Sequence, residues 1–310
     1  MSSASQPLAV PRAGLAALAG DYATLTKARV TTLIVMTAWT GAFFAAEKSG
    51  TSLLSWTLLH ALIGIGLVSG GTAAINEVVE RDLDALMRRT ARRPLVTGSM
   101  SLLHASVVAY GMTIGGVLYL WWTTNGLTAA LATLTSVSYL AVYTPMKRVH
   151  PICTFLGAFP GAMPPVLGWT AIRGRLDGEA LALFAIVFFW QFPHFHSIAW
   201  LYREDYENAR IRMLPVVESD GRSTAFAIVM YAAALVPVSL APTLLGMSGW
   251  IYFAGALLLG LGMLWFSLRM WTMKLTPIEP ESKVRARNVL QASVIYLPLL
   301  FALMMINRAR

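Results

Sequence analysis

The sequence is poor in charge and in cysteine, and each shortage excludes a class of protein. Only 13% of the 310 residues are charged while 56% are hydrophobic, a balance that few soluble domains have. The single cysteine, Cys153, excludes an intramolecular disulfide and leaves too few thiols for a cysteine metal site. The first residues, MSSASQPLAVPRAG, lack the apolar core of a signal peptide. They are small, polar and interrupted by proline, so we expect a disordered cytoplasmic tail over residues 1–27.

The sequence is rich in long apolar runs of about twenty residues, the length that crosses the hydrocarbon core of a bilayer. We therefore predict an all-α, polytopic membrane protein, a bundle of nine transmembrane helices embedded in the lipid bilayer. No change of composition divides the runs, so residues 28–310 are expected to form one domain. The predicted spans are 28–46, 54–80, 102–122, 126–144, 151–171, 179–201, 223–245, 249–271 and 288–307.

The basic residues are distributed unevenly between the two ends of these spans. With the N-terminus in the cytoplasm, nineteen of the 24 Lys and Arg residues lie on the cytoplasmic side, as the positive-inside rule requires. Topology explains the net charge of +9, so no nucleic-acid partner is expected. We predict a multi-pass protein of a bacterial inner membrane whose N-terminus and active-site loops are cytoplasmic.

The stretch from Ala74 to Leu95 concentrates charge at the end of the second predicted span. At 100° per residue, Asn76, Glu80 and Asp84 drift by about 40° at each step of four residues, or about 80° over two turns, so their oxygens share one helical face. Asp82 lies about 240° from Asn76 and is off that face. A row of oxygen ligands suits Mg²⁺, which binds carboxylates together with substrate phosphates. The alternative is a charge cluster that only follows membrane topology.

Basic side chains follow this oxygen row, and guanidinium groups match the geometry of phosphate oxygens. They are Arg88, Arg89, Arg92 and Arg93. Two further cations, Lys147 and Arg148, follow Pro145, which is expected to end the fourth span. These two either grip a diphosphate or are ordinary interfacial anchors. Carboxylates, cations and a membrane edge together indicate a phosphorylated lipid as substrate.

The fifth span is interrupted by helix breakers, namely Gly157, Pro160, Gly161, Pro164, Pro165 and Gly168. They predict a kinked helix, which is tolerated where neighbours or a cavity satisfy the freed backbone groups. A cavity-lining role is favoured over simple close packing.

The sixth span ends in polar groups, which are costly at a membrane edge and usually face the interior of a bundle. They are Gln191, His194, His196, Tyr202, Arg203, Asp205 and Asn208. The two histidines diverge by about 200° on a helix, so they cannot both ligate one metal ion. Either imidazole is suited to ligate haem iron or to bind a propionate, and either is equally suited to a structural role. Asp205 and Asn208 predict a second oxygen face, with a capping or loop role for Asn208 as the alternative.

These motifs resemble the UbiA superfamily of intramembrane prenyltransferases, and the resemblance extends over all nine spans. It rests first on Asn76-x₃-Glu80-x₃-Asp84 followed by Arg89-Thr90-x₂-Arg93-Pro94-Leu95. Further segments resemble the branch that farnesylates haem: Arg81-Asp82-Leu83-Asp84-x₂-Met87, Tyr143-Thr144-x₂-Lys147-Arg148, Trp190-Gln191-x-Pro193-His194-Phe195 and Tyr202-Arg203-x-Asp205-Tyr206. The chain departs from the family pattern twice, since Glu80 stands where aspartate is commoner and Asn208 stands in place of a second aspartate.

The resemblance implies an enzyme that transfers the farnesyl group of farnesyl diphosphate to a vinyl group of haem b, giving haem O. It implies Mg²⁺ as cofactor, with Asn76, Glu80, Asp84 and Asp205 as ligands and Lys147 and Arg148 acting with them in catalysis. It implies substrate contacts at Arg89, Arg93, Tyr143, His194, His196, Tyr202 and Asn208. A haem-handling partner enzyme is also expected.

Three other functions fit parts of the sequence. A homologous enzyme with an aromatic or chlorin acceptor would keep the first motif without needing the histidines. A cation-coupled transporter would bury its charges near the midplane and show an internal repeat, whereas these charges lie at span ends and no repeat is evident. A haem-binding structural subunit would have no use for the oxygen row.

Overall fold

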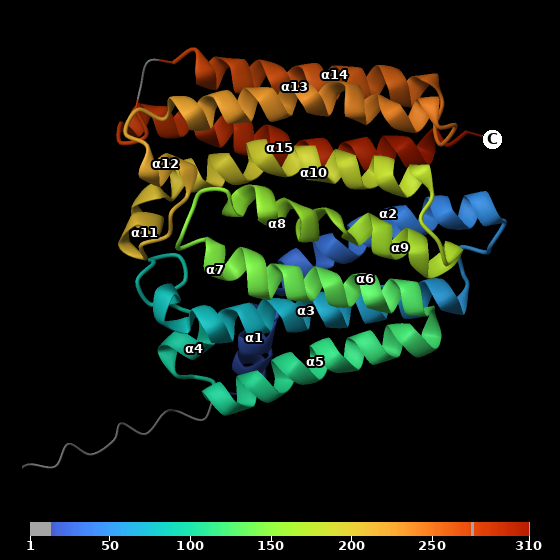
Figure 1. The fold of residues 1–310 in the computed structure, drawn as a ribbon, viewed down its shortest axis with the longest axis horizontal. Coiled ribbons are helices and arrows are strands. Elements are labelled where there is room, and N and C mark those ends of the chain that lie inside the picture. The colour runs from blue at the N-terminus through green and yellow to red at the C-terminus, as the bar shows by residue number, and fades with distance from the viewer. Residues whose placement is uncertain (1–13, 274–275, 310) are drawn as a thin grey trace, which may run out of the picture.

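The computed structural model describes residues 14–273 and 276–309. Within these ranges nine helical segments are long and apolar enough to cross a membrane, so the prediction of an all-α bundle is confirmed. They run side by side along the long axis of the molecule (Figure 1). The segments are α2 (Ala28–Ser49), α3 (Trp56–Asp84), α5 (Leu102–Thr123), α6 with η1 and α7 (Gly126–Met146), α8 with α9 (Cys153–Arg173), α10 (Gly178–Leu201), α13 (Arg222–Leu244), α14 (Trp250–Trp271) and α15 (Pro280–Ile306).

Short helices gather at one end of the bundle, on the left in Figure 1. They are α4 (Pro94–Thr97), α11 (Arg203–Asn208) and α12 (Leu214–Val217), while α1 (Leu15–Leu25) lies below α3, nearer the middle of the view. The expectation of a disordered tail over residues 1–27 is wrong for residues 15–25, which form α1, and residues 1–13 lie outside the described residues. Leu25 of α1 is buried in a cluster with Ala74, Ile75 and Leu95, so this helix contributes to the core beside the first motif.

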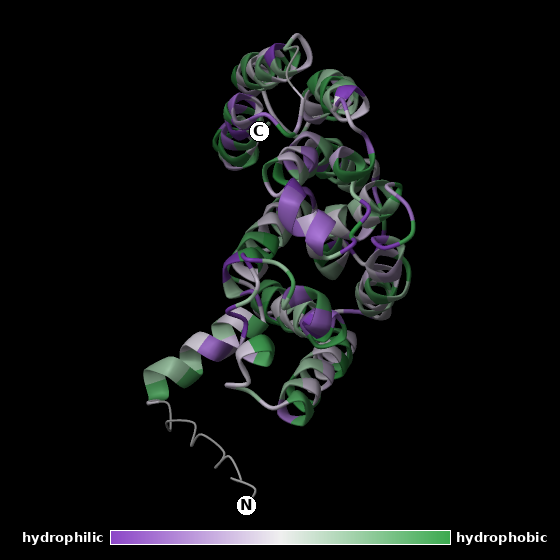
Figure 2. Cartoon of the chain, turned by 90° about the vertical axis from the view of Figure 1, so that its left-hand side faces the viewer, coloured by the Kyte–Doolittle hydropathy of each residue, from purple (hydrophilic) through white to green (hydrophobic). Residues whose placement is uncertain are grey.

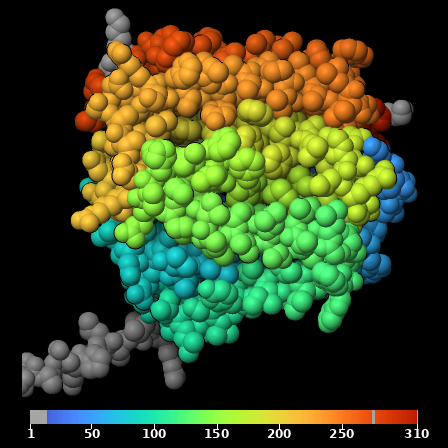
Figure 3. All heavy atoms as spheres, in the orientation of Figure 1, coloured from blue at the N-terminus to red at the C-terminus, as the bar shows by residue number. Residues whose placement is uncertain are grey.

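The transmembrane helices pack in two groups. In the first, α3 packs on α5 and α2 packs on α9, while in the second, α10 packs on both α13 and α15. On the front face, α5 and α6, then α8 and α10, and then α13 follow one another from bottom to top in the order of the chain (Figure 3). The largest apolar core lies mainly in the second group and includes Trp169, Trp200, Tyr252 and Tyr296. The first motif lies in the first group, at the C-terminal end of α3.

Two glycines allow α2 and α9 (Pro164–Arg173) to approach closely. A Cβ atom on Gly168 would lie 1.8 Å from the carbonyl oxygen of Ala38, and one on Gly41 would lie 1.9 Å from that of Pro165. Helix backbones meet this closely only where side chains are minimal. Close packing therefore explains Gly168, so the favoured expectation of a cavity-lining role is wrong for this glycine.

The ends of α3 and α15 differ from the predicted spans because polar residues extend both helices. Helix α3 begins after Ser55, whose hydroxyl caps it by accepting a hydrogen bond from the amide of Leu58 at 3.3 Å. It continues to Asp84, four residues beyond the predicted span, and so carries the whole oxygen row on one rigid helix. Helix α15 begins at Pro280, a residue type suited to the first turn, eight residues before the predicted span.

Candidate active site

The oxygen row of α3 faces inward at the polar end of the bundle. Asn76, Glu80 and Asp84 are 1%, 8% and 1% exposed, whereas the side chain of Asp82 is 87% exposed and pairs with Arg81. This difference agrees with the helical phase expected from the sequence. Seen end-on, hydrophilic residues gather on the loops and short helices at this end, including α11 (Figure 2).

Each member of the row is bound by a cation from another part of the chain. Lys27 Nζ donates a 3.0 Å hydrogen bond to Asn76 Oδ1, and Lys147 Nζ lies 2.9 Å from both carboxylate oxygens of Glu80. Arg93 forms an ion pair with Asp84. Asn76 Nδ2 also donates to Glu80 Oε2 at 2.9 Å. Buried charges are stable only when paired and hydrogen-bonded, and here the pairing is internal.

Lys27 was one of the nineteen basic residues on the predicted cytoplasmic side, and the sequence analysis explained it by membrane topology alone. It lies between α1 and α2 with φ of 46°, a left-handed conformation that is uncommon for a residue with a side chain. Burial, together with the nearby charges of Arg93 and Lys147, lowers the pKa of Lys27 to about 8. No sequence pattern links Lys27 to α3, because the contact spans 49 residues.

Lys147 reaches Glu80 because the fourth span changes its helical geometry. The π-helical segment η1 (Ser138–Tyr143) precedes α7 (Thr144–Met146), and the Thr144 hydroxyl donates to the carbonyl oxygen of Tyr139 at 3.0 Å. The same hydroxyl oxygen accepts a 3.3 Å hydrogen bond from Asn76 Nδ2. Lys147 Nζ lies 4.6 Å from the ring centroid of Tyr143. Such π-helical insertions often occur at functional sites.

Glu77 is the carboxylate that the sequence analysis did not assign. It is fully buried, and neither of its carboxylate oxygens has a hydrogen-bond partner. Arg93 Nε lies 3.7 Å from Glu77 Oε2, so one guanidinium faces both Glu77 and Asp84. The sequence could have placed Glu77 on the same helical face as Asp84, because the two are seven residues apart and diverge by only about 20°.

The residues expected on the other side of the site are partly brought together. Arg89 Nη2 donates to the hydroxyl of Tyr206 at 2.9 Å, and its guanidinium lies 5.7 Å from the ring centroid of Tyr202. Asp205 is buried and accepts a 3.4 Å hydrogen bond from the backbone amide of Arg88. Helix α11 is thereby attached to the segment that follows Asp84.

Two expected site residues are positioned differently from their predicted partners. Asn208 is exposed at the last residue of α11, whereas Asp205 is buried, so the expectation that they form a single oxygen face is wrong. Arg148 is exposed next to the buried Lys147, so the two neighbouring cations do not point into the site together.

His194 and His196 contact different elements, as their divergence on a helix predicts. His194 Nδ1 lies 2.9 Å from the hydroxyl of Ser293 on α15, and its ring stacks on Trp190. His196 is buried, with Nδ1 2.8 Å from the carbonyl oxygen of Phe192. A carbonyl only accepts, so Nδ1 of His196 carries the proton and Nε2 keeps a free lone pair. None of these contacts joins either histidine to the oxygen row.

The donor chemistry of the first motif fits Mg²⁺, since amide and carboxylate oxygens are the ligands that hard cations take. Across the described ranges, no three side chains of the Asp, Glu, His or Cys type converge on one point. The carboxylates of Glu80 and Asp84 are instead held by Lys147 and Arg93. A metal ion entering this row would therefore replace cations that are already present.

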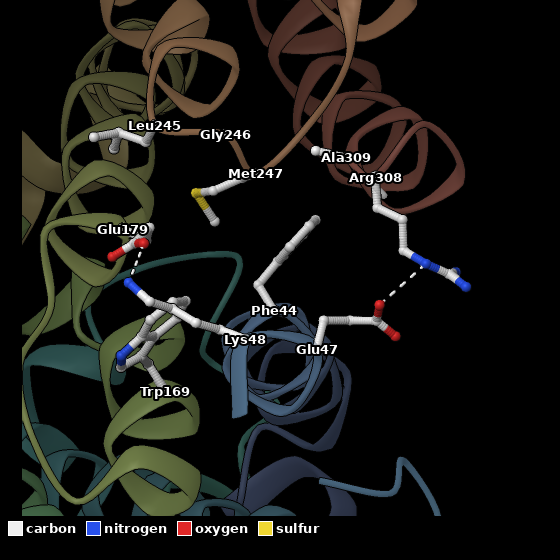
Figure 4. Close-up of a pocket in the computed structure, with 10 residues that line it drawn as sticks. All are labelled: Phe44, Glu47, Lys48, Trp169, Glu179, Leu245, Gly246, Met247, Arg308 and Ala309. Carbon is white, nitrogen blue, oxygen red and sulfur yellow. Dashed lines mark hydrogen bonds and ion pairs between the residues drawn. The ribbon is translucent and has the colours of Figure 1, made fainter. Parts of the chain in front are cut away.

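A cavity of 460 Å³ lies at the opposite end of the bundle and contains none of these residues. Two ion pairs line it, between Lys48 and Glu179 and between Arg308 and Glu47 (Figure 4). Because it lies away from the oxygen row, it contributes nothing to the chemistry described above.

Comparison with known proteins gives a consistent result. The model of the UbiA prenyltransferase family matches residues 34–279. A protoheme IX farnesyltransferase of Koribacter versatilis is 71% identical over 308 residues, covering 99% of each chain. One of Solibacter usitatus is 49% identical, covering 93% of this chain and 98% of the relative.

Solved structures share the fold at lower sequence identity. A UbiA homolog from Archaeoglobus fulgidus bound to GPP and Mg²⁺ has a TM-score of 0.64 at 16% identity, covering 92% of this chain and 99% of that one. A UbiA homolog from Aeropyrum pernix has a TM-score of 0.66 at 19% identity, covering 90% and 97%. At these identities the structures support the fold alone. Together with the family match and the close relatives, they show that this multi-pass membrane protein belongs to the UbiA prenyltransferase family.

Proposed function

We propose that this chain transfers the farnesyl group of farnesyl diphosphate to a vinyl group of protohaem IX, giving haem O. The observation that carries the prenyl transfer is the buried oxygen row of α3, held by Lys27, Lys147 and Arg93 at the polar end of a membrane bundle. The acceptor is supported by the relatives described as protoheme IX farnesyltransferases, which align over nearly the whole chain.

In this proposal the diphosphate binds at the C-terminal end of α3. Asn76, Glu80 and Asp84 would hold Mg²⁺, with Asp205 as a further ligand, and the bound ion would offset charge on the leaving diphosphate. The chain's own cations supply the rest of the stabilisation: Lys147 lies at this row, Arg93 lies beside Asp84, and Arg89 is aimed by Tyr206.

The reaction would proceed by cleavage of the carbon–oxygen bond of the farnesyl diphosphate, with the electron pair leaving on the diphosphate. The allylic cation is attacked by the electron-rich vinyl group, which forms the new carbon–carbon bond. A water molecule then adds to the resulting cation and loses one proton, which gives a hydroxyethylfarnesyl side chain. The apolar bundle excludes other water from the cation, and excluding water strengthens the electrostatic contacts around the leaving group.

Mass spectrometry of haem extracted from bacteria that lack their own enzyme tests this function. Cells that express the chain should contain haem O, and cells with the empty vector should contain only haem b. A farnesylated phenol or chlorin in place of haem O would favour the aromatic or chlorin acceptor instead. We also place the chain in the bacterial inner membrane, with α1 and the motif loops cytoplasmic and a haem-handling enzyme as partner.

The histidines of α10 are proposed to orient the haem. His196 is the better candidate for iron, because its Nδ1 is committed to the carbonyl of Phe192 and its Nε2 lone pair is free. His196→Ala should therefore alter the Soret band of added haem more than His194→Ala, while both variants keep farnesyl diphosphate affinity. Unchanged spectra in both variants would remove the histidines from the acceptor site.

A further inference from the structure

The six charged side chains at the oxygen row form a self-neutralising cluster. Three are acids on α3 and three are bases from elsewhere, and we refer to the set as the charge cluster: Glu77, Glu80, Asp84, Lys27, Lys147 and Arg93. The acids are at most 8% exposed, so each charge depends on its partners inside the cluster rather than on water.

A cation alone cannot enter this cluster without loss. To reach Glu80 and Asp84 it must displace Lys147 and Arg93, which would then lack an anion in a partly buried site. A diphosphate alone also binds poorly, because the bases it needs are held by the carboxylates and the carboxylates repel it. When the two arrive together, the metal takes the carboxylates and the diphosphate takes the released bases. No charge is then left unpaired.

Lys27 differs from the other two bases in one respect. Lys147 and Arg93 are paired with carboxylates, whereas the partner of Lys27 is the neutral amide oxygen of Asn76, 3.0 Å from Nζ. Within the charge cluster, Glu77 is the acid whose carboxylate oxygens have no hydrogen-bond partner. Lys27 can therefore leave its present partner without separating an ion pair.

We propose that Lys27 is a diphosphate-binding residue, and that Lys27, Lys147 and Arg93 exchange from α3 oxygens to the diphosphate as the metal binds, so that metal and diphosphate bind cooperatively. The proposal rests on the proposed use of a prenyl diphosphate. It adds a residue outside the family motif and an energetic reason for binding the two ligands as a pair. The coupling is reciprocal, so each ligand should tighten the other by the same factor.

The test uses purified full-length protein with Mn²⁺ in place of Mg²⁺ and farnesyl thiodiphosphate as an unreactive substrate analogue. Free Mn²⁺ is followed by electron paramagnetic resonance, and analogue binding is followed by calorimetry. In the wild type, saturating analogue should tighten Mn²⁺ binding by at least about tenfold, and Mn²⁺ should tighten analogue binding equally. Equal Mn²⁺ affinity with and without bound analogue would overturn the exchange.

The Lys27→Met variant isolates the new residue. It should bind the analogue about tenfold more weakly at saturating Mn²⁺, a loss typical of one charge-assisted contact. Its binding of Mn²⁺ alone should be no weaker than in the wild type. Lys27→Arg should restore most of the analogue affinity, which guards against a folding defect. The matched control is Lys48→Met, the same change at the opposite end of α2, where the lysine pairs with Glu179.

Analogue affinity that is unchanged in Lys27→Met, or lost equally in Lys48→Met, would overturn the role of Lys27. A folded wild type that binds no analogue at any Mn²⁺ concentration would instead overturn the proposed function, and this inference with it. The two failures are therefore distinguishable, because the first leaves analogue binding in the wild type intact.

Discussion

Asp84 and Asp82 lie two residues apart on the same helix and face opposite environments, which makes them a matched pair for mutation. The Asp84 side chain is 2% exposed and pairs with Arg93, whereas the Asp82 side chain is 87% exposed and pairs with Arg81. Each aspartate can be replaced by asparagine, which removes the charge and keeps the shape. The comparison therefore separates the inward face of α3 from the general loss of negative charge at the membrane edge.

Asp84→Asn should lower the rate of haem O formation at least about 100-fold, equivalent to about 2.7 kcal/mol of transition-state stabilisation. Breaking a buried pair typically costs about 3–5 kcal/mol of stability. Here the loss should fall at or below the low end, because Glu77 Oε2 lies 3.7 Å from Arg93 Nε and remains as its counterion. Asp82→Asn loses an exposed pair worth about 1 kcal/mol at most and should keep near-normal activity.

The assay quantifies haem O and haem b by mass spectrometry in cells that express each variant, with protein level measured in the same membranes. Normal haem O from Asp84→Asn at normal expression would show that Asp84 is not needed as a ligand. An equal or greater loss in Asp82→Asn would show that the inward face of α3 has been assigned incorrectly.

Three further predictions follow from single contacts. Gly168→Ala should destabilise the protein by about 1–3 kcal/mol through overpacking, measured as a lower thermal midpoint in detergent. The control Gly111→Ala, which has no atom near the new Cβ, should keep the wild-type midpoint, and equal midpoints for both variants would refute the close approach. Thr144→Val removes one hydrogen bond to Asn76, worth about 1 kcal/mol, and should slow turnover about fivefold at unchanged protein level. Arg89→Lys should raise the KM for farnesyl diphosphate, because lysine lacks the planar fork; an unchanged KM would place Arg89 outside the substrate site.

The membrane architecture could be predicted from sequence because it depends on local properties. An apolar run of sufficient length must form a helix in lipid, since each backbone group has to be satisfied within the segment. The inward face of α3 was predictable for the same reason: the angle between Asn76 and Asp84 depends only on helical geometry, and it also placed Asp82 outside. Helix α1 was not predicted, because its sequence is short and its support comes from packing of Leu25 on residues far along the chain.

The partners of the oxygen row could not be predicted in this way. Lys27 and Lys147 reach α3 from 49 and 67 residues away, and their approach depends on a left-handed residue and on a π-helical segment. Neither feature leaves a clear mark in composition or periodicity. Sequence analysis left Lys27 within the positive-inside pattern, which describes where cations accumulate and not which oxygens they meet. It offered Lys147 as a diphosphate contact, but not its ion pair with Glu80.

Glu77 was missed because its role also depends on a contact with another part of the chain, although its angular position on α3 could be predicted. A carboxylate on the inward face of a helix is costly in an apolar bundle unless a cation compensates it. Its role therefore depends on knowing that Arg93 lies within reach of both Glu77 and Asp84. The position of the Arg93 guanidinium explains why the buried carboxylate of Glu77 is tolerated. In the proposed function, Glu77 would keep Arg93 within the site while Asp84 binds the metal ion, so that the guanidinium is beside the diphosphate when the carbon–oxygen bond breaks.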